Sequence, residues 1–234
     1  MNSYSASPIT IQIIENAKAF GASFAGIASV ASLKNSPSHK VGRKLWWSEG
    51  AKSVLVLALH HKMSEPKLDW WDNKEGGSPG NRQMIRTAIN LRQWLKEEFN
   101  INAQPLPYHI EKGGIFLKDA AALAGLGAIG KNNLMITPQF GPRVRLCALL
   151  LDVELGPTGP IDFTPCEGCD MPCRHVCPQK AFASGSYVKA LCNVQMKKDE
   201  ANKVIFKEVD NDHSPTMLVK YCRACELSCP VARQ

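Results

Sequence analysis

The stretch CEGCDMPCRHVCP at residues 166–178, together with CRACELSCP at residues 222–230, decides how the C-terminal part of this chain folds. Each run spaces its cysteines closely and ends in Cys-Pro, and Cys192 lies alone between the two runs. Closely spaced thiolates followed by Cys-Pro are the ligand pattern of a two-cluster ferredoxin, and iron–sulfur clusters select thiolate ligands. The pattern therefore predicts two 4Fe–4S clusters and a protein that transfers electrons.

In such a pattern the cysteine before proline binds the cluster of the opposite run. One predicted cluster then has the ligands Cys166, Cys169, Cys173 and Cys229. The other has the ligands Cys177, Cys192, Cys222 and Cys225. Neither run completes a site alone, so we expect cluster assembly and folding to be coupled. The first run departs from the usual spacing by one extra residue between Cys169 and Cys173, which can bulge the loop.

Zinc is the main alternative metal for these cysteines, since it also binds four thiolates and is commonly held by C-x-x-C pairs. It does not require three cysteines in one short run with a fourth before proline, present twice. Disulfides fit less well, because the cysteine count of nine is odd and residues 1–20 lack the features of a secretory signal. We therefore expect a reducing, cytoplasmic setting. The ninth cysteine, Cys147, lies in an apolar run and is predicted to be a buried core residue.

The length of 234 residues suits one large domain and a small one. No apolar run approaches the roughly 18 residues of a membrane span, so no membrane partner is expected. The net charge of +7 is dispersed, without a run of five or more basic residues. The charge alone therefore does not indicate a nucleic-acid surface, although an acidic partner or an anionic ligand is compatible with it.

Residues 1–155 alternate between helical and extended patterns. Helices are predicted at 8–20, 81–100 and 117–124, strands at 23–30, 53–61, 132–137 and 144–154, and an extended edge piece at 101–107. The nearly unbroken apolar run at 53–61 predicts a strand buried on both faces. Residues 62–80 are polar and are predicted to form a loop. The Gly-Pro-rich stretch at 156–160 marks the boundary between a first domain, 1–155, and a cysteine-rich domain, 156–234.

The glycine-rich stretch GLGAIGK at residues 125–131 matches G-x-G-x-x-G and G-x-x-x-x-G-K, two motifs whose backbone amides bind phosphates. Both motifs require a strand before the loop and a helix after it, whereas here a helical segment precedes the loop and a strand follows. Asn132 also occupies the position where a triphosphate-binding loop has Ser or Thr. We therefore expect the glycines to allow close approach of the backbone to a different ligand, one that is large and flat.

The glycine loop in its setting, FLKDAAALAGLGAIGKNNLMITPQFGPRVRL at residues 116–146, followed by the two Cys-Pro runs, resembles the epoxyqueuosine reductase family and its relatives, the reductive dehalogenases. AFGASFAGIA at 19–28 and GAKSVLVLALHH at 50–61 resemble the opening helix–strand unit and the second strand of that family. The resemblance implies an α/β (α+β) first domain of nitroreductase-like fold that binds cobalamin. It also implies a ferredoxin-like C-terminal domain whose two clusters pass electrons to cobalt.

The resemblance also assigns roles to individual residues. The eight cysteines of the tail match the cluster ligands of the family, with Cys192 in the place of its single intermediate cysteine. The loop beside the corrinoid is matched by Gly125, Gly127, Gly130, Lys131 and Asn132, while Ala128 replaces a common Trp. Glu111 stands near the position of the proton-donating Asp of the family, with Tyr108 and Lys118 as nearby alternatives. The simpler interpretation of Glu111 is a solvated loop charge.

Two features limit which activities of the family can be expected of this chain. The chain ends five residues after Cys229, where the family continues into a tRNA-binding extension, and it carries no twin-Arg export signal. We therefore expect a short cytoplasmic relative in which a low-potential donor, ferredoxin or flavodoxin, reduces the clusters. The clusters then feed a corrinoid that reduces an unidentified substrate, either a small molecule or a protein-bound corrinoid. Alternatives are an electron carrier or corrinoid-protein reductase without its own substrate, a tRNA-modifying relative, and flavin in place of the corrinoid.

Overall fold

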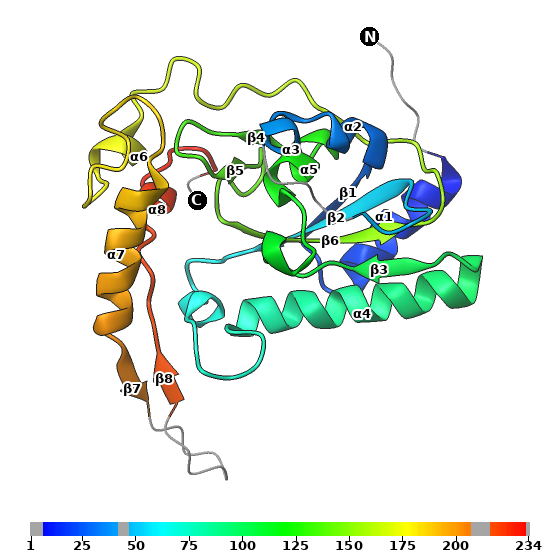
Figure 1. Ribbon diagram of the computed structural model, residues 1–234, viewed down its shortest axis with the longest axis horizontal. Helices are drawn as coiled ribbons and strands as arrows, with labels where there is room; N and C mark the ends of the chain where they lie inside the picture. Colours follow the sequence, from blue (N-terminus) through cyan, green and yellow to red (C-terminus); the bar gives the residue numbers. More distant parts are fainter. Residues whose placement is uncertain (1–6, 42–46, 207–215, 233–234) are drawn as a thin grey trace.

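The computed structural model describes residues 7–41, 47–206 and 216–232. A four-stranded antiparallel sheet with the order β1-β2-β6-β3 lies at the centre of the molecule (Figure 1). Strand β6 comes late in the chain, yet it pairs with the whole of β2, from Ser53↔Leu151 to His60↔Val144. The predicted mixed α/β class is therefore confirmed. Along the chain the elements are α1 (Pro8–Ala19), β1 (Phe24–Ser29), α2 (Val30–Lys34), α3 (Pro37–Val41), β2 (Ser53–His60), η1 (Pro66–Asp69), α4 (Pro79–Phe99), β3 (Ala103–Pro105), η2 (Ile110–Lys112), α5 (Leu117–Leu123), β4 (Ala128–Ile129), β5 (Met135–Ile136), β6 (Val144–Leu151), α6 (Pro172–His175), α7 (Lys189–Ala201), β7 (Val204–Phe206), β8 (Thr216–Leu218) and α8 (Ala224–Leu227).

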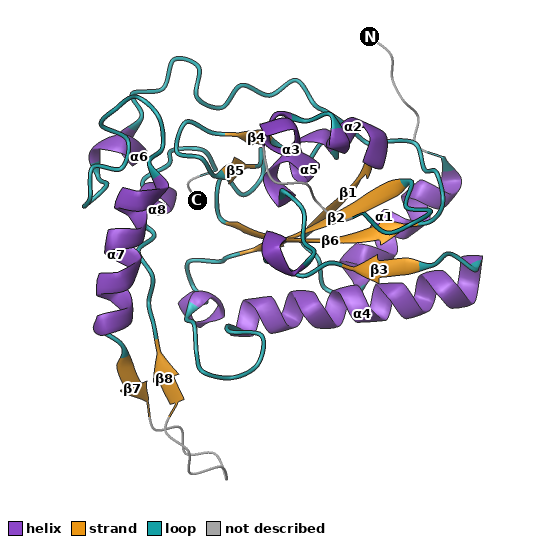
Figure 2. Ribbon diagram, in the orientation of Figure 1, coloured by secondary structure: helices purple, strands orange, loops and turns teal. Residues whose placement is uncertain are grey.

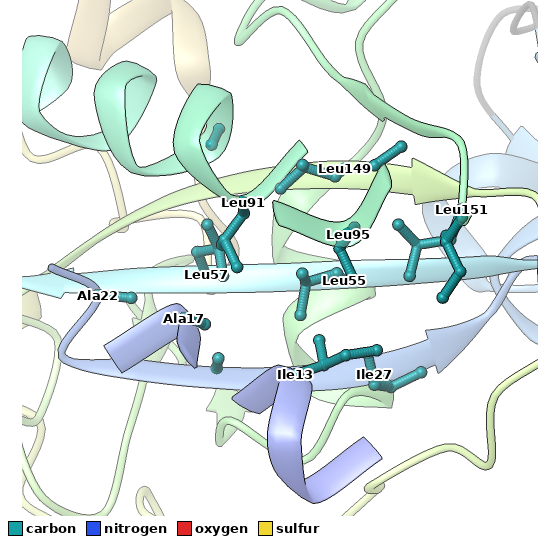
Figure 3. Packing of buried hydrophobic residues seen from close by; sticks show 14 of the residues in the cluster. Ile13, Ala17, Ala22, Ile27, Leu55, Leu57, Leu91, Leu95, Leu149 and Leu151 are labelled. Carbon is teal, nitrogen blue, oxygen red and sulfur yellow. The ribbon is translucent and has the colours of Figure 1, made fainter. Parts of the chain in front are cut away.

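Helices cover both faces of this sheet, which explains why its central strand has no polar face. On one face α1 and α4 pack against the sheet, and Figure 3 shows Leu91 and Leu95 of α4 lying against Leu57 and Leu55 of β2. On the other face α2 and α5 pack against alternate residues of the same strand, such as Val56. Successive side chains of a strand point to opposite faces, so both sets are apolar. The prediction of a strand buried on both faces is confirmed.

The long helix α4 begins two residues before the predicted start, because its first turn is set by a cap and a proline. Ser78 precedes the helix in extended conformation, and its Oγ accepts a hydrogen bond from the amide of Asn81 at 3.2 Å. Pro79 occupies the first helical position, where its missing N–H costs nothing. The helix ends at Asn100, which adopts a left-handed conformation with φ of 53°.

Other predicted elements are shorter than the sequence pattern suggests. The strand predicted at 132–137 is confined to β5, which pairs with β4 as a two-stranded ribbon. The edge piece predicted at 101–107 forms the edge strand β3. The loop predicted at 62–80 contains the short helix η1 and the first residues of α4. The local sequence pattern predicted where these elements lie in the chain. Their length depends on which neighbouring segments the fold offers for pairing.

The C-terminal tail lies beside the α/β body and is built from short elements (Figure 2). Residues 154–164, which contain the predicted domain boundary, form neither helix nor strand. Within this segment Thr158 is nevertheless fixed to the body, because its Oγ1 accepts from the amide of Ile27 at 2.8 Å and donates to the carbonyl of Ala124 at 2.6 Å. The segment is therefore a packed connection.

A buried carboxylate joins α3 to α5 on the second face of the sheet. Asp119 accepts hydrogen bonds from Ser36 Oγ at 2.7 Å, Ser38 Oγ at 2.8 Å and the Ser38 amide at 3.1 Å. Nδ1 of His39 lies 3.8 Å from the same carboxylate. Burial alone would raise the pKa of Asp119, but the hydrogen bonds from His39, Ser36 and Ser38 outweigh it and lower the pKa to about 2. Asp119 is therefore ionised and stabilises the packing of these two helices.

Replacing Asp119 by asparagine is expected to lower the free energy of unfolding by about 2 kcal/mol at neutral pH. The folded pKa lies below the ordinary value of 3.8, so this stabilisation is complete above that value and is lost as the pH falls towards 2. Urea unfolding of both proteins at a series of pH values measures the difference. The difference should shrink below about pH 4. A difference that stays constant over this range would contradict the assignment.

Candidate functional site

The eight cysteines of the tail lie in two groups, and each group draws on both cysteine runs. Burial raises the pKa of Cys173, and three neighbouring sulfurs raise it further: Cys229, Cys166 and Cys169. Burial likewise raises the pKa of Cys225 to about 12, with added contributions from Cys222, Cys192 and Cys177. We call these sets the first cysteine group (Cys166, Cys169, Cys173 and Cys229) and the second cysteine group (Cys177, Cys192, Cys222 and Cys225). Each set has the same members as one of the crossed ligand sets predicted from the spacing, and the ligand roles stay predictions. Within residues 7–41, 47–206 and 216–232, no three His, Cys, Asp or Glu side chains converge on a site that could hold a metal ion.

The extra residue of the first run is accommodated by a single left-handed residue. Met171 has φ of 52° and directly precedes Pro172, the first residue of α6. In this conformation the amide of Met171 donates to Sγ of Cys169 at 3.3 Å. A bulge in this loop stays a prediction, and the sulfurs of Cys229, Cys166 and Cys169 still influence the pKa of Cys173.

The side chains of these two groups are of the type that iron–sulfur clusters select as ligands. All eight cysteines are free thiols. Backbone amides donate to several of the sulfurs, including Ala181 N to Cys177 Sγ at 3.3 Å and Lys131 N to Cys166 Sγ at 3.4 Å. Such N–H···S contacts orient ligands and tune a metal site. The raised pKa values of Cys173 and Cys225 favour the neutral thiols, and the cations of a bound cluster would favour the thiolates instead.

Cys147, the ninth cysteine, lies apart from both groups. It packs against the hydrophobic core on the face covered by α1 and α4. Burial raises the pKa of its thiol to about 12, so it is a neutral core side chain at neutral pH. This agrees with the core role predicted for it.

The glycine loop packs tightly against the protein's own chain. A Cβ on Gly125 would lie 2.7 Å from the carbonyl oxygen of Thr158, and one on Gly127 would lie 2.0 Å from that of Ile136. At Gly130 the nearest atom would be Cδ1 of Ile136 at 2.3 Å. The need for glycine therefore comes from packing against the connection at 154–164 and the β4–β5 ribbon. This packing accounts for the glycines without a ligand, and the expected approach of a flat ligand to the loop stays a prediction.

The end of the glycine loop contacts both cysteine groups. The amide of Lys131 faces Cys166 of the first group, as described above. The side chain of Asn132 is buried, and its Nδ2 donates to the carbonyl of Cys225 in the second group at 3.4 Å. Its Oδ1 accepts from the amide of Leu134 at 3.2 Å, which fixes the orientation of the amide. Two of the predicted cofactor-binding residues thus lie where the body meets both cysteine groups.

The two predicted proton donors lie at the surface. Tyr108 is 58% exposed, and Glu111 sits on η2 with its side chain 64% exposed. Oε1 of Glu111 lies 3.4 Å from Nδ1 of His109. The alternative residue, Lys118, is more buried, and its Nζ donates to the carbonyl of Asn133 beside the glycine loop at 2.6 Å. Desolvation lowers the pKa of Lys118, and the catalytic roles of all three stay predictions.

Sequence reasoning missed two charged positions beside the cysteine groups. Arg143 is buried, donates to the carbonyl of Ala232, and its charge lowers the pKa of Cys229 against the dominant effect of burial. Asp69 lies in the region predicted only as a polar loop, yet it forms an ion pair with Arg223 between Cys222 and Cys225. No local pattern marks either residue, because the partners lie far away in the chain.

Within residues 7–41, 47–206 and 216–232, no helix is long and apolar enough to cross a membrane.

Comparison with known proteins identifies relatives of the whole chain and of part of it. No family model matches. The chain is 24% identical to the epoxyqueuosine reductase of Gloeobacter violaceus over 256 aligned residues, which cover 95% of this chain and 76% of that protein. Over most of its length the chain is homologous to epoxyqueuosine reductases. A crystal structure of epoxyqueuosine reductase with an epoxyqueuosine-modified tRNA-Tyr stem loop superposes with a TM-score of 0.69 at 19% identity.

The similarity to reductive dehalogenases is higher but local. The tetrachloroethene reductive dehalogenase of Sulfurospirillum multivorans is 42% identical over 67 residues, or 28% of this chain and 13% of that protein. The superposition on the epoxyqueuosine reductase structure covers 96% of this chain and 65% of that chain. This chain thus spans less than two thirds of that structure and a small part of the dehalogenase. Together the relatives support a mixed α/β fold shared with epoxyqueuosine reductases.

Proposed function

We propose that this chain is an iron–sulfur reductase in which two 4Fe–4S clusters deliver low-potential electrons to a corrinoid held by residues 1–155. The observation that carries the proposal is the gathering of eight free thiols into two groups of four, each combining both cysteine runs. Iron–sulfur clusters reach reduction potentials of about −700 mV, low enough to supply a strong reductant. The homology to epoxyqueuosine reductases and reductive dehalogenases supports the same class of chemistry.

In this proposal the first and second cysteine groups hold the clusters of a ferredoxin-like domain at 156–234. The body at 1–155 has a nitroreductase-like fold and receives the corrinoid beside the loop from Gly125 to Asn132. A bound corrinoid would supply a low-valent metal centre able to reduce a substrate. Glu111 or Tyr108 then donates the proton to the product, and an acidic ferredoxin or flavodoxin in the cytoplasm supplies the electrons.

A second candidate is an electron-transfer protein that binds no corrinoid of its own. The packing of the glycine loop favours this candidate, since the Cβ positions of Gly125 and Gly127 face the protein's own backbone. The loop glycines therefore do not require a ligand. The two candidates share the clusters and differ only in the cofactor of the body.

Anaerobic purification with quantification of iron, sulfide, cobalt and flavin tests both candidates, followed by titration of the protein with cobalamin. About eight irons per chain with one corrinoid bound per chain would support the reductase. Eight irons without corrinoid uptake would support the electron carrier, and protein that binds zinc in place of iron would overturn both. The loaded protein is then offered tetrachloroethene and an epoxyqueuosine-modified tRNA stem loop, the compounds in the names of its relatives.

Glu111→Gln is expected to lower turnover by at least about 100-fold with whichever substrate is reduced, because the amide cannot donate the proton. Iron content and corrinoid binding should stay as in the unchanged protein, since the Glu111 side chain is exposed. Glu154→Gln, also at an exposed position, is the matched control. Equal turnover in the two variants would remove Glu111 from the mechanism and direct attention to Tyr108 and Lys118.

A further inference from the structure

One buried carboxylate outside the cysteine groups contacts two arginines and a histidine from three distant segments. Asp69, at the end of η1, is only 9% exposed. Its Oδ1 lies 2.8 Å from Nδ1 of His61, which follows β2, and 3.0 Å from Nη2 of Arg145 in β6. Its Oδ2 accepts from Nη1 of Arg223 in the tail. Asp69 therefore connects the ends of β2 and β6 to the second cysteine run.

Asp69 offsets the positive charges of Arg145 and Arg223 only when its carboxyl group is ionised. Burial by itself favours the neutral acid, but the interactions with His61, Arg223 and Arg145 outweigh it and lower the pKa of Asp69. Two guanidinium groups taken out of water require such a partner, because an unpaired buried charge is strongly unfavourable. His61 and Arg145 thus hold Asp69 in place, and Asp69 in turn holds Arg223.

Arg223 lies between two cysteines of the second group. It directly follows Cys222 and is two residues before Cys225. Its guanidinium also pairs with Glu226 of α8, so the ion pair with Asp69 fixes the turn that presents both thiols. A neighbouring contact supports the same junction, since Trp71 and Val219 exchange two backbone hydrogen bonds at 3.0 and 2.7 Å.

We propose that Asp69 is a positioning residue for the cluster of the second cysteine group, acting through its ion pair with Arg223. The inference rests on the proposed function, because it requires a cluster at this group. Asp69 holds Arg223 against the body and offsets the positive charge that Arg223 places beside the cluster. It thereby sets both the geometry of Cys222 and Cys225 and the reduction potential of one cluster.

The direction in which each substitution shifts the reduction potential distinguishes an electrostatic role of Asp69 from a merely structural one. Reduction adds negative charge to a cluster, so a nearby cation favours the reduced form and a nearby anion opposes it. Asp69→Asn removes the anion and should shift the potential of one cluster upward. Arg223→Gln removes the cation and should shift the same potential downward. A general loosening of the fold would move both variants in the same direction.

The test is a redox titration of the two clusters by electron paramagnetic resonance, with iron and sulfide determined for each variant of the full chain. The matched control is Asp72→Asn, which breaks another buried Asp–Arg pair of the same loop, with Arg82 at 2.8 and 2.9 Å. We expect Asp69→Asn and Arg223→Gln to change one potential in opposite directions, while Asp72→Asn leaves both unchanged. Selective loss of one cluster in Asp69→Asn also supports the positioning role.

Unchanged potentials and iron content in Asp69→Asn, or equal changes in Asp69→Asn and Asp72→Asn, would overturn the inference. So would loss of both clusters together, or shifts of the same sign in Asp69→Asn and Arg223→Gln. The iron content of the unchanged protein is measured separately. If it binds no clusters, the proposed function fails, whereas eight irons with no selective effect at Asp69 removes only this inference.

Discussion

Replacing Cys229 by serine is expected to remove the cluster of the first cysteine group, although Cys229 belongs to the second run. Iron should fall from about eight to about four per chain, and the signal of one cluster should disappear. The reason is that Cys229 lies beside Cys166, Cys169 and Cys173, and its sulfur contributes to the raised pKa of Cys173. Iron analysis and electron paramagnetic resonance of the reduced protein measure the effect.

Two further variants decide whether the pairing is crossed. Cys173→Ser should abolish the same signal as Cys229→Ser, while Cys222→Ser should abolish the other. Cys147→Ala, at a thiol that lies in the hydrophobic core, should keep about eight irons and both signals. If Cys229→Ser and Cys222→Ser abolish the same signal, the pairing follows the runs and the two groups described here are wrong as ligand sets.

Gly127→Ala is expected to lower the free energy of unfolding by about 3 kcal/mol or more, a large effect for one methyl group. The new Cβ would lie 2.0 Å from the carbonyl oxygen of Ile136 and 2.8 Å from its carbon, so the backbone of the β4–β5 ribbon must move. The residue also has φ of 158°, at the edge of the region that favours glycine. Urea unfolding followed by circular dichroism measures the change.

Gly50→Ala separates the clash from the backbone strain. Gly50 has φ of 78°, but its Cβ would meet no atom within 4 Å. Only the strain of a left-handed alanine remains there, and we expect a cost of about 1 kcal/mol. Similar costs at the two positions would show that the ribbon yields easily and that the packing of Gly127 is not what requires glycine.

Much of the fold could be predicted from local pattern. The run Val54 to Leu59 contains apolar residues only, and such a strand needs cover on both faces. The apolar residues that recur between 81 and 100 predict an amphipathic helix. The pattern did not predict the start at Pro79, and two members of the expected apolar face, Ile85 and Ile89, are 44% and 52% exposed. These signals work because they depend on neighbours within a few residues.

The order of the sheet could not be predicted in the same way. β6 lies between β2 and β3, although residues 61–143 separate it from β2 in the chain. Pairing between distant strands depends on packing that no local window contains. The same holds for Asp69, whose partner Arg223 is 154 residues away. In the sequence Asp69 is one acidic residue among several in a polar loop.

The candidate site also combines features that the sequence predicts with features that only the fold determines. The number, spacing and Cys-Pro ends of the two runs could be read directly from the chain, because ligand spacing is a local property. The crossed assignment of Cys229 to the first run and of Cys177 to the second followed from the same Cys-Pro ends. Only the tertiary structure showed that Gly125 and Gly127 pack on the chain itself. Local sequence carries the chemistry of side chains, whereas their burial, charge partners and neighbours arise from contacts between segments that the fold brings together.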